Sequence, residues 1–270
     1  MHAILFFQKL HIMNPQEEPN ELKNDPLHIG PLSTNKSKIK QNQLMKADVI
    51  PRHPSSVIFN GSSGLGKSNL VCTLLKEPQF YGKYFKKKNI YLISPTGVSD
   101  DMFEHLKLPS SNIIVDIRKG AKAKLESIMS EQLEVIDSKG IEKAEKVLII
   151  FEDIQSNGPF MRSSEFLKCF LMNRHYGLSV WLCGQSFKLT PKACRIQANN
   201  IFCFQPTNSE REILVENYTP PGMSKKRFID VINQATEAPW SFMHINKRVG
   251  FAKRYRRNLG NIILVNNYSD

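Results

Sequence analysis

A glycine-rich segment constrains the fold of this chain more than any other feature of its sequence. It reads Gly61-Ser62-Ser63-Gly64-Leu65-Gly66-Lys67-Ser68 and matches G-x-x-x-x-G-K-[ST] at every fixed position. The apolar run Val57-Ile58-Phe59 precedes it, and the helix-compatible residues 68–75 follow it. This order of strand, loop and helix is the context in which such a loop binds phosphate. The alternative is a Gly/Ser turn that happens to end in lysine.

The chemistry of this segment suits a triphosphate. Glycines let the backbone bend so that successive N–H groups point inward, and the positive end of the following helix attracts the same anion. Lys67 would then reach the β- and γ-phosphates, and the hydroxyl of Ser68 would bind Mg²⁺. We therefore predict that residues 61–68 bind a nucleoside triphosphate.

Two adjacent carboxylates end a second apolar strand. Residues 147–151 are all apolar, and Glu152 and Asp153 follow them directly. In enzymes that use Mg²⁺ and a nucleotide, one such carboxylate supports the metal and the other polarises the attacking water. We expect Ser68 and Glu152 to hold the metal beside the loop. The alternative is a buried strand that leaves the sheet through an acidic turn.

A third strand ends in an amide. Residues 178–184 are mostly apolar and are followed by Gln185. Open α/β sheets bind ligands at the carboxyl ends of their strands, so Gln185 could hydrogen-bond the γ-phosphate or the attacking water. A strand that simply ends in a polar residue is the alternative.

The rest of the chain alternates between short strands and helices. We predict strands at residues 89–95, 112–116, 200–205 and 240–245, and helices at 121–140, 160–176, 210–217 and 224–235. This alternation predicts an α/β fold with a mainly parallel central sheet flanked by helices. We expect three regions: a flexible N-terminal arm (1–50), a nucleotide-binding domain (51–245) and a basic C-terminal segment (246–270).

The composition narrows the class of protein. A hydrophobic share of 41% and a charged share of 23% are typical of a soluble globular protein, and no run approaches the roughly 18 apolar residues of a membrane-spanning helix. We also expect no signal peptide. The five cysteines include no C-x-x-C pair, which indicates reduced thiols in a reducing compartment.

The net charge of +12 indicates a polyanionic partner such as nucleic acid. Cations are densest near the C-terminus, where Phe251 and Tyr255 alternate with them and could stack on bases. The candidate nucleic-acid contacts are Lys247, Arg248, Lys253, Arg254, Arg256 and Arg257. A solvated basic tail is the alternative.

Taken together, these motifs resemble the viral genome-packaging ATPases of the poxvirus type, within the FtsK-HerA class of DNA-pumping P-loop NTPases. The resemblance runs from about Val57 to Gln205. It rests on residues 61–68, 149–153, 173–180 and 184–187.

The resemblance implies a role for each matching residue. Lys67 and Ser68 would bind ATP with Mg²⁺, Asp153 would assist hydrolysis, and Gln185 would sense the γ-phosphate. The family usually has aspartate where this chain has Glu152, which leaves the division of roles between Glu152 and Asp153 open.

The resemblance also implies partners. It implies a ring of subunits around double-stranded DNA, with an arginine from one subunit completing the site of its neighbour. Arg174 is our first candidate for that arginine and Arg162 our second. A capsid or portal-like viral protein is a further candidate partner. The expected location is the reducing interior of an infected host cell, with association with the virion also open.

The leading hypothesis is therefore an ATP-driven translocase that packages viral double-stranded DNA into a capsid. A helicase or other nucleic-acid remodelling ATPase would use the same chemistry. A small-molecule kinase would share the loop and Mg²⁺ but would need an acceptor pocket and a lid. A basic DNA-binding structural protein with a vestigial nucleotide site is the alternative from another class. The intact Lys67, Ser68 and both carboxylates count against it.

Overall fold

The computed structural model describes residues 48–97 and 101–263. Nearly all of the predicted N-terminal arm lies outside them. The strands are β1 (Ser56–Asn60), β2 (Ile90–Ile93), β3 (Ile113–Ile114), β4 (Val147–Glu152), β5 (Leu178–Gly184), β6 (Asn200–Phe204), β7 (Phe242–Asn246), β8 (Tyr255–Arg257) and β9 (Asn261–Ile262). The α-helices are α3 (Lys67–Lys76), α4 (Asp101–Glu104), α5 (Gly120–Lys139), α6 (Gly158–Met161), α7 (Ser164–Leu171), α8 (Lys192–Gln197), α9 (Asn208–Tyr218), α10 (Lys225–Thr236) and α11 (Phe251–Arg254). Short 3-10 helices are η1 (Lys87–Asn89), η3 (Ser110–Asn112), η4 (Ile141–Lys143) and η5 (Ile154–Ser156).

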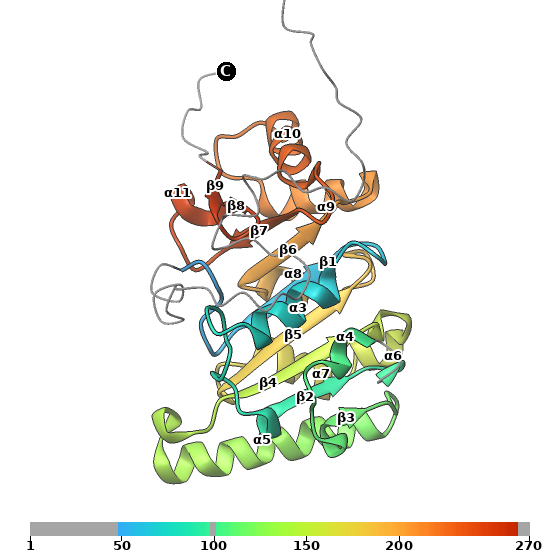
Figure 1. Cartoon of the computed structure of the whole chain (residues 1–270), viewed down its shortest axis with the longest axis vertical. Coiled ribbons are helices and arrows are strands. Elements are labelled where there is room, and N and C mark those ends of the chain that lie inside the picture. The colour runs from blue at the N-terminus through green and yellow to red at the C-terminus, as the bar shows by residue number, and fades with distance from the viewer. Residues whose placement is uncertain (1–47, 98–100, 264–270) are drawn as a thin grey trace, which may run out of the picture.

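The described strands form one sheet in the order β3-β2-β4-β5-β1-β6-β7-β8-β9 (Figure 1). From β3 to β6 every neighbouring pair is parallel, and β7, β8 and β9 add antiparallel pairs. All residues of β1, β4, β5 and β6 are buried, as expected for parallel strands covered on both faces. The predicted fold class, a mainly parallel sheet flanked by helices, is confirmed.

Helices cover both faces of this sheet. Alternate side chains of a strand point to opposite faces, so Ile58 packs in one core while Val57 and Phe59 pack in the other. α3 and α4 contribute to the core that contains Phe59, and α5, α6, α7, α8, α9 and α10 contribute to the core that contains Ile58 (Figure 1). Among the described residues, no helix is long and apolar enough to cross a membrane.

The predicted helix over residues 160–176 was wrong in its length. The structure has two shorter helices, α6 and α7, and the chain leaves helical geometry at Arg162 and Ser163. The hydroxyl of Ser163 accepts a hydrogen bond from Phe166 N at 3.3 Å and so starts α7 anew. A serine in this position satisfies an N–H group that the start of a helix leaves unpaired, which favours the break.

The sheet continues past residue 246, where the sequence predicted a separate basic segment to begin. β8 pairs with β7, and β9 pairs with β8. Tyr255 is 1% exposed, and its hydroxyl donates to Tyr218 O at 2.7 Å. This buried ring ties β8 to the end of α9.

His244 is a fully buried titratable group on β7. Its ring stacks on Phe202 at 4.3 Å between centroids, and Nε2 donates to Asn200 Oδ1 at 2.8 Å. Burial lowers the pKa of His244 to about 3, and the positive charge of Arg256 adds to the shift. The folded protein therefore holds this ring neutral at pH values where an unfolded histidine is protonated.

We predict that His244 makes the folded state less stable in mild acid. The unfolded chain binds a proton at this position below about pH 6.5, whereas the folded chain does so only near pH 3. The free energy of unfolding should therefore fall with decreasing pH in that window, by up to about 1.4 kcal/mol per pH unit from this group. Urea unfolding at pH 7, 6, 5 and 4 measures the slope.

The variant His244→Gln, which keeps an N–H donor for Asn200, should lose less stability per pH unit than the wild type. His105→Gln, at an exposed position, is the matched control. Burial also lowers the pKa of His53, to about 4, so part of the slope should remain in both variants. Equal slopes in His244→Gln and the wild type would contradict this account.

Candidate functional site

The glycine-rich loop joins the central strand β1 to helix α3. Gly66 is the residue before α3 and has φ 95°, a left-handed conformation that residues with a side chain rarely adopt. In the part of the chain that the structure describes, no side chain caps the helix, so N–H groups of its first turn are left for another acceptor. An anion beside the loop would satisfy these donors and would meet the positive end of a ten-residue helix.

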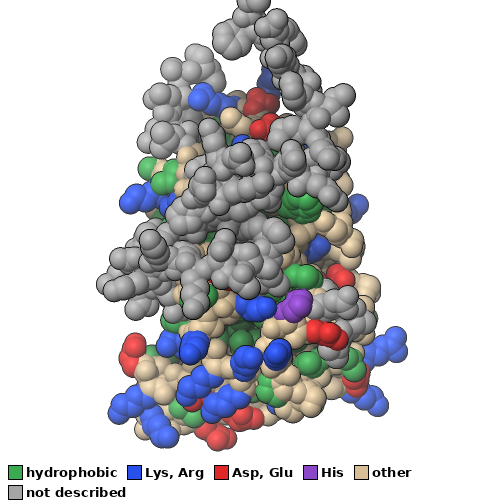
Figure 2. Space-filling model, viewed as in Figure 1, with side chains coloured by type: hydrophobic (Ala, Val, Ile, Leu, Met, Phe, Trp, Pro, Cys, Tyr) green, Lys and Arg blue, Asp and Glu red, His purple; other side chains and the backbone are tan. Residues whose placement is uncertain are grey.

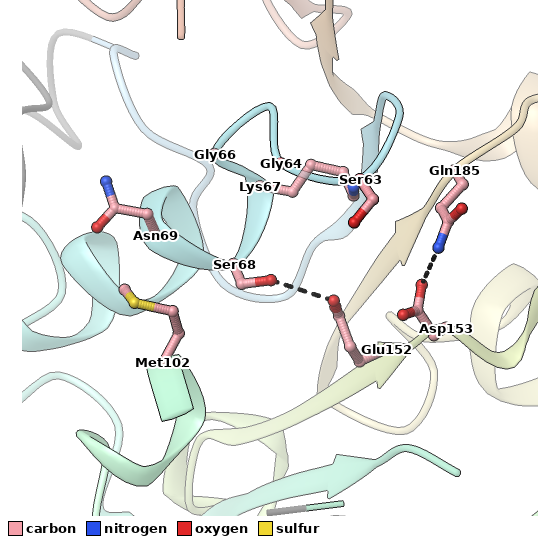
Figure 3. Close-up of a pocket in the computed structure, with 10 residues that line it drawn as sticks. All are labelled: Ser63, Gly64, Gly66, Lys67, Ser68, Asn69, Met102, Glu152, Asp153 and Gln185. Atoms are coloured by element: carbon pink, nitrogen blue, oxygen red, sulfur yellow. Dashed lines mark hydrogen bonds between the residues drawn. The ribbon is translucent and has the colours of Figure 1, made fainter. Parts of the chain in front are cut away.

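A cavity of about 270 Å³ opens beside this loop. Ser63, Gly64, Gly66, Lys67, Ser68, Asn69, Met102, Glu152, Asp153 and Gln185 line it (Figure 3). The predicted loop, carboxylates and amide therefore converge on one cavity. They meet because β4 pairs in parallel with β5 and β5 pairs in parallel with β1, so that the three strands end at the same edge of the sheet.

Glu152 lies on the floor of the cavity. It is 4% exposed, and Oε1 accepts a hydrogen bond from the hydroxyl of Ser68 at 3.2 Å (Figure 3). The other oxygen, Oε2, is buried and has no hydrogen-bond partner among the described residues. Burial raises the pKa of Glu152 to about 7, although a hydrogen bond with the Cys183 thiol and the charge of Lys67 offset part of the shift.

These two residues fit Mg²⁺. The ion prefers oxygen ligands, and the site offers a hydroxyl oxygen and a carboxylate whose second oxygen has no partner. A nearby divalent cation favours the ionised carboxylate and so opposes the effect of burial on Glu152.

Asp153 and Gln185 form a second pair at the mouth of the cavity. Gln185 Nε2 donates to Asp153 Oδ1 at 3.1 Å (Figure 3). Asp153 has φ 50°, so the chain turns sharply after β4 and directs the two neighbouring carboxylates to different partners. Lys67 Nζ donates to Ser62 O at 3.0 Å within the loop. Lys67 is therefore folded against the phosphate loop and does not pair with Glu152.

Gln155 is a residue of the site that the sequence analysis missed. Its Oε1 accepts from Gln185 N at 2.7 Å and Ser186 N at 3.0 Å. Its Nε2 donates to Ser186 O at 2.7 Å and Thr190 Oγ1 at 2.8 Å. One buried amide therefore holds the backbone that carries Gln185. A glutamine in the short turn after β4 belongs to no motif, and the sequence gives no signal for its role.

Glu210 is the second residue that was missed. It lies on α9, is 6% exposed, and accepts hydrogen bonds from Asn60 Nδ2 at 3.0 Å, Ser186 Oγ at 2.7 Å and Phe187 N at 2.8 Å. Asn60 is the last residue of β1, directly before the phosphate loop. Glu210 therefore links the start of that loop to the segment after Gln185, and it does so from a helix outside the predicted motifs.

The two candidate arginines lie at different edges of the sheet. Arg174 precedes β5 in the chain, so it lies at the amino end of that strand, whereas Gln185 follows the carboxyl end. Arg174 lines another cavity, of about 570 Å³, together with residues such as Ser56 and Asn199. Arg162 follows α6 after the carboxyl end of β4 and is exposed. Neither arginine is among the described residues that line the cavity beside the loop.

Internal contacts hold several cations of the C-terminal basic run. Arg256 is 5% exposed, which leaves no surface for a phosphate contact, and the prediction that Tyr255 stacks on bases is wrong because its ring is buried. The guanidinium of Arg248 donates to Arg52 O and Pro54 O. The other four cations have these surroundings: Lys247 donates to Ile196 O, Arg254 lies over the ring of Phe251, Arg257 pairs with Glu237, and Lys253 is exposed.

Comparison with known proteins gives one family. The family model described as Poxvirus A32 protein matches residues 39–255. None of the curated proteins matches the chain. Among solved structures, EssC (ATPases 2 and 3) from Geobacillus thermodenitrificans is 13% identical with a TM-score of 0.54, over 80% of this chain and 41% of that one. The genome packaging NTPase B204 from Sulfolobus turreted icosahedral virus 2, in complex with AMP, is 14% identical with a TM-score of 0.50, over 79% of this chain and 100% of that one. These structures share the fold.

The contact between Gln155 and Gly184 predicts a coupled pair of substitutions. A Cβ atom at Gly184 would lie 2.3 Å from Gln155 Nε2. Gly184→Ala should therefore lower the free energy of unfolding by about 1–3 kcal/mol, the usual cost of an overfilled core. In a Gln155→Ala background the same change should cost much less, because the clashing amide is gone. Urea unfolding of the two single variants and the double variant measures this coupling.

Gly250→Ala is the matched control, because no atom of the described residues lies within 4 Å of a Cβ atom at that position. It should change stability by only a few tenths of a kcal/mol in either background. If Gly184→Ala lowers the free energy of unfolding by the same amount with and without the Gln155 side chain, the amide does not limit the space at residue 184.

Proposed function

The chain belongs to the Poxvirus A32 protein family. We propose that it is a viral genome-packaging ATPase that uses Mg²⁺ and ATP to drive double-stranded DNA into a capsid. One observation carries the proposal at the level of the site: the phosphate loop, the Ser68–Glu152 pair and the Asp153–Gln185 pair line a single cavity. This is the set of groups that ATP hydrolysis requires.

We propose that the loop and the first turn of α3 bind the phosphates. The backbone N–H groups would face the phosphate oxygens, and Lys67 would exchange its hydrogen bond with Ser62 O for the β- and γ-phosphates. Ser68 and Glu152 would hold Mg²⁺, with Glu152 acting directly or through water. The ion, when bound, supplies positive charge that neutralises the phosphate oxygens.

Asp153 would orient the attacking water and accept its proton, while Gln185 would contact the γ-phosphate. The geometry supports this division, since Glu152 is buried against Ser68 and Asp153 is paired with Gln185 at the mouth of the cavity. Loss of the γ-phosphate would change the contacts of Gln185. Because Gln155 and Glu210 bond to residues 185–187, that change would reach α9.

The charge of the chain supports a DNA partner. The net charge is +12, and Lys and Arg side chains gather over the part of the molecule near β2 and α5 on the face drawn in Figure 2. The exposed lysines before β2 are Lys86, Lys87 and Lys88, of which Lys86 and Lys88 pair with Glu145. We propose that a ring of subunits surrounds the DNA, docks on the capsid and acts within infected cells. Among the six C-terminal cations, Lys253 is the best placed to contact phosphate because its side chain is exposed.

We predict that duplex DNA stimulates ATP hydrolysis and that salt removes the stimulation. Contacts between cations and phosphates release counterions, so the stimulation should fall steeply between 50 and about 200 mM salt. Lys67→Ala should abolish turnover with and without DNA while leaving the urea unfolding midpoint close to that of the wild type. Steady-state phosphate release across a salt series measures this. A strong preference for single-stranded DNA would count against packaging, and turnover retained by Lys67→Ala would exclude the loop as the site.

We predict that Arg174 acts on the cavity of a neighbouring subunit. It lies at the opposite edge of the sheet from its own cavity, so it can complete a site only in trans. Arg174→Ala should lower turnover of the assembled protein by about a thousandfold, as the loss of such arginines does in related chemistry.

Mixing Arg174→Ala subunits with Glu152→Gln/Asp153→Asn subunits should restore part of the turnover, because some interfaces then combine an intact arginine with intact carboxylates. Arg162→Ala, tested in the same way, serves as the comparison. If no mixture containing Arg174→Ala recovers activity, Arg174 is a structural residue.

A further inference from the structure

A further cavity, of about 380 Å³, adjoins the phosphate loop on the side away from Glu152 and Asp153. Its walls come from the loop itself (Leu65), from the end of β6 (Phe204 and Gln205) and from residues 237–241 before β7. β6 pairs with β1 on the edge opposite to β5, so this cavity and the one lined by Glu152 lie on opposite sides of the strand that leads into the loop.

Trp240 lines this cavity and is unusual in both its exposure and its backbone conformation. The side chain is 54% exposed, and the residue has φ 57°, a left-handed conformation that large residues avoid. The neighbouring turn holds it there, because both the N–H and the hydroxyl of Ser241 donate to Ala238 O, at 3.1 and 2.6 Å. The structure thus keeps a large aromatic ring at the surface beside the nucleotide loop.

Trp240 also contacts the loop. A Cβ atom placed on Gly66 would lie 3.5 Å from Trp240 Cδ1 and 3.8 Å from Phe204 Cε1. Gly66 at the same time lines the cavity that contains Lys67 and Glu152. Gly66 therefore lies between the first cavity and Trp240, and a ligand whose phosphates lie over the loop can place its remaining part next to the indole ring.

We propose that the cavity beside Trp240 binds the base of the nucleotide, and that this base is a purine stacked on the indole. The proposal rests on the proposed function, since it assumes that the loop holds the phosphates. Leu65 and Phe204 supply apolar surface for the edge of the rings, and the exposed amide of Gln205 supplies a donor and an acceptor for the polar atoms of a base. A purine offers more stacking area than a pyrimidine.

Glu237 is the charged residue that lines this cavity, and its negative charge does not prevent a base from binding. The carboxylate of Glu237 pairs with Arg257 at 3.6 Å, which offsets its charge. The cavity is otherwise lined by apolar and neutral polar residues. It therefore suits a flat, neutral, aromatic group and not a further phosphate.

The two tryptophans of the chain allow a direct test. Trp181 is 1% exposed and Trp240 is 54% exposed, so acrylamide quenching of tryptophan fluorescence reports mainly on Trp240. ATP with Mg²⁺ should protect the fluorescence from acrylamide. Inorganic tripolyphosphate with Mg²⁺ should leave the quenching unchanged, because it carries no base. Protection by both ligands, or by neither at saturating ATP, would overturn the proposal.

Binding constants give the second test. Trp240→Ala should weaken ATP binding by about tenfold or more, the usual effect of removing an aromatic ring that stacks on a base, and should leave tripolyphosphate binding unchanged. Trp240→Phe should restore most of the ATP affinity. The wild type should prefer ATP to CTP, and Trp240→Ala should lose that preference. Phe251→Ala, which removes another exposed aromatic ring, is the matched control and should bind all three ligands like the wild type.

The tripolyphosphate measurements separate the two proposals. If Trp240→Ala binds ATP as tightly as the wild type does, the base does not stack on Trp240, although the loop can still hold phosphate. If neither ATP nor tripolyphosphate binds the wild type, the proposed function fails first. Unchanged tripolyphosphate binding also verifies that Trp240→Ala has folded around an intact loop.

Discussion

The parallel pairing of β4, β5 and β1 is the constraint on which the site depends. A triphosphate with its metal needs N–H donors, a cation, two carboxylates and an amide within one cavity, yet these groups are spread along the chain from Gly61 to Gln185. Parallel strands end at the same edge of a sheet, so the backbone pairing of β1, β4 and β5 brings together the groups that follow these strands. The buried oxygen Oε2 of Glu152 is a local cost of this arrangement, because an unpaired polar atom inside a protein is unfavourable unless a ligand reaches it.

Sequence reasoning found the parts of the site that are contiguous in the chain. The loop at 61–68, the carboxylates after β4 and the amide after β5 each carry their signal within a few residues, and the cavity contains members of all three. Gln155 and Glu210 were missed because their role depends on long-range contacts. Gln155 bonds to a residue 30 positions away and Glu210 to one 150 positions away, and a pattern within one segment cannot encode such contacts. The same limit applies to Tyr255, whose basic neighbours suggested an exposed segment although pairing with β7 buries the ring.

The fold, like the candidate site, could be predicted from the sequence only in part. Long apolar runs such as residues 147–151 and 178–184 indicate buried strands whatever their neighbours are, and the structure has β4 and β5 there. The break between α6 and α7 depends on a single hydroxyl, that of Ser163, which competes with an otherwise helical apolar pattern. The strands β8 and β9 are short, and their formation depends on the antiparallel edge that β7 offers, so the local sequence alone gives little sign of them.

The position of β1 between β5 and β6 gives the loop two different sides. The side toward β5 gathers Glu152, Asp153 and Gln185, which we propose act on phosphate, whereas the side toward β6 and β7 presents Phe204 and Trp240. Glu210 connects the two sides, since its carboxylate bonds to Asn60 at the end of β1 and to Ser186 after β5, while its helix α9 follows β6 in the chain. A change at the γ-phosphate that moves residues 185–187 must therefore also act on α9, which packs against α10 and, through the bond between Tyr255 and Tyr218, against β8. In this way the C-terminal part of the sheet, where β8 carries Arg256 and Arg257, is mechanically joined to the proposed nucleotide site.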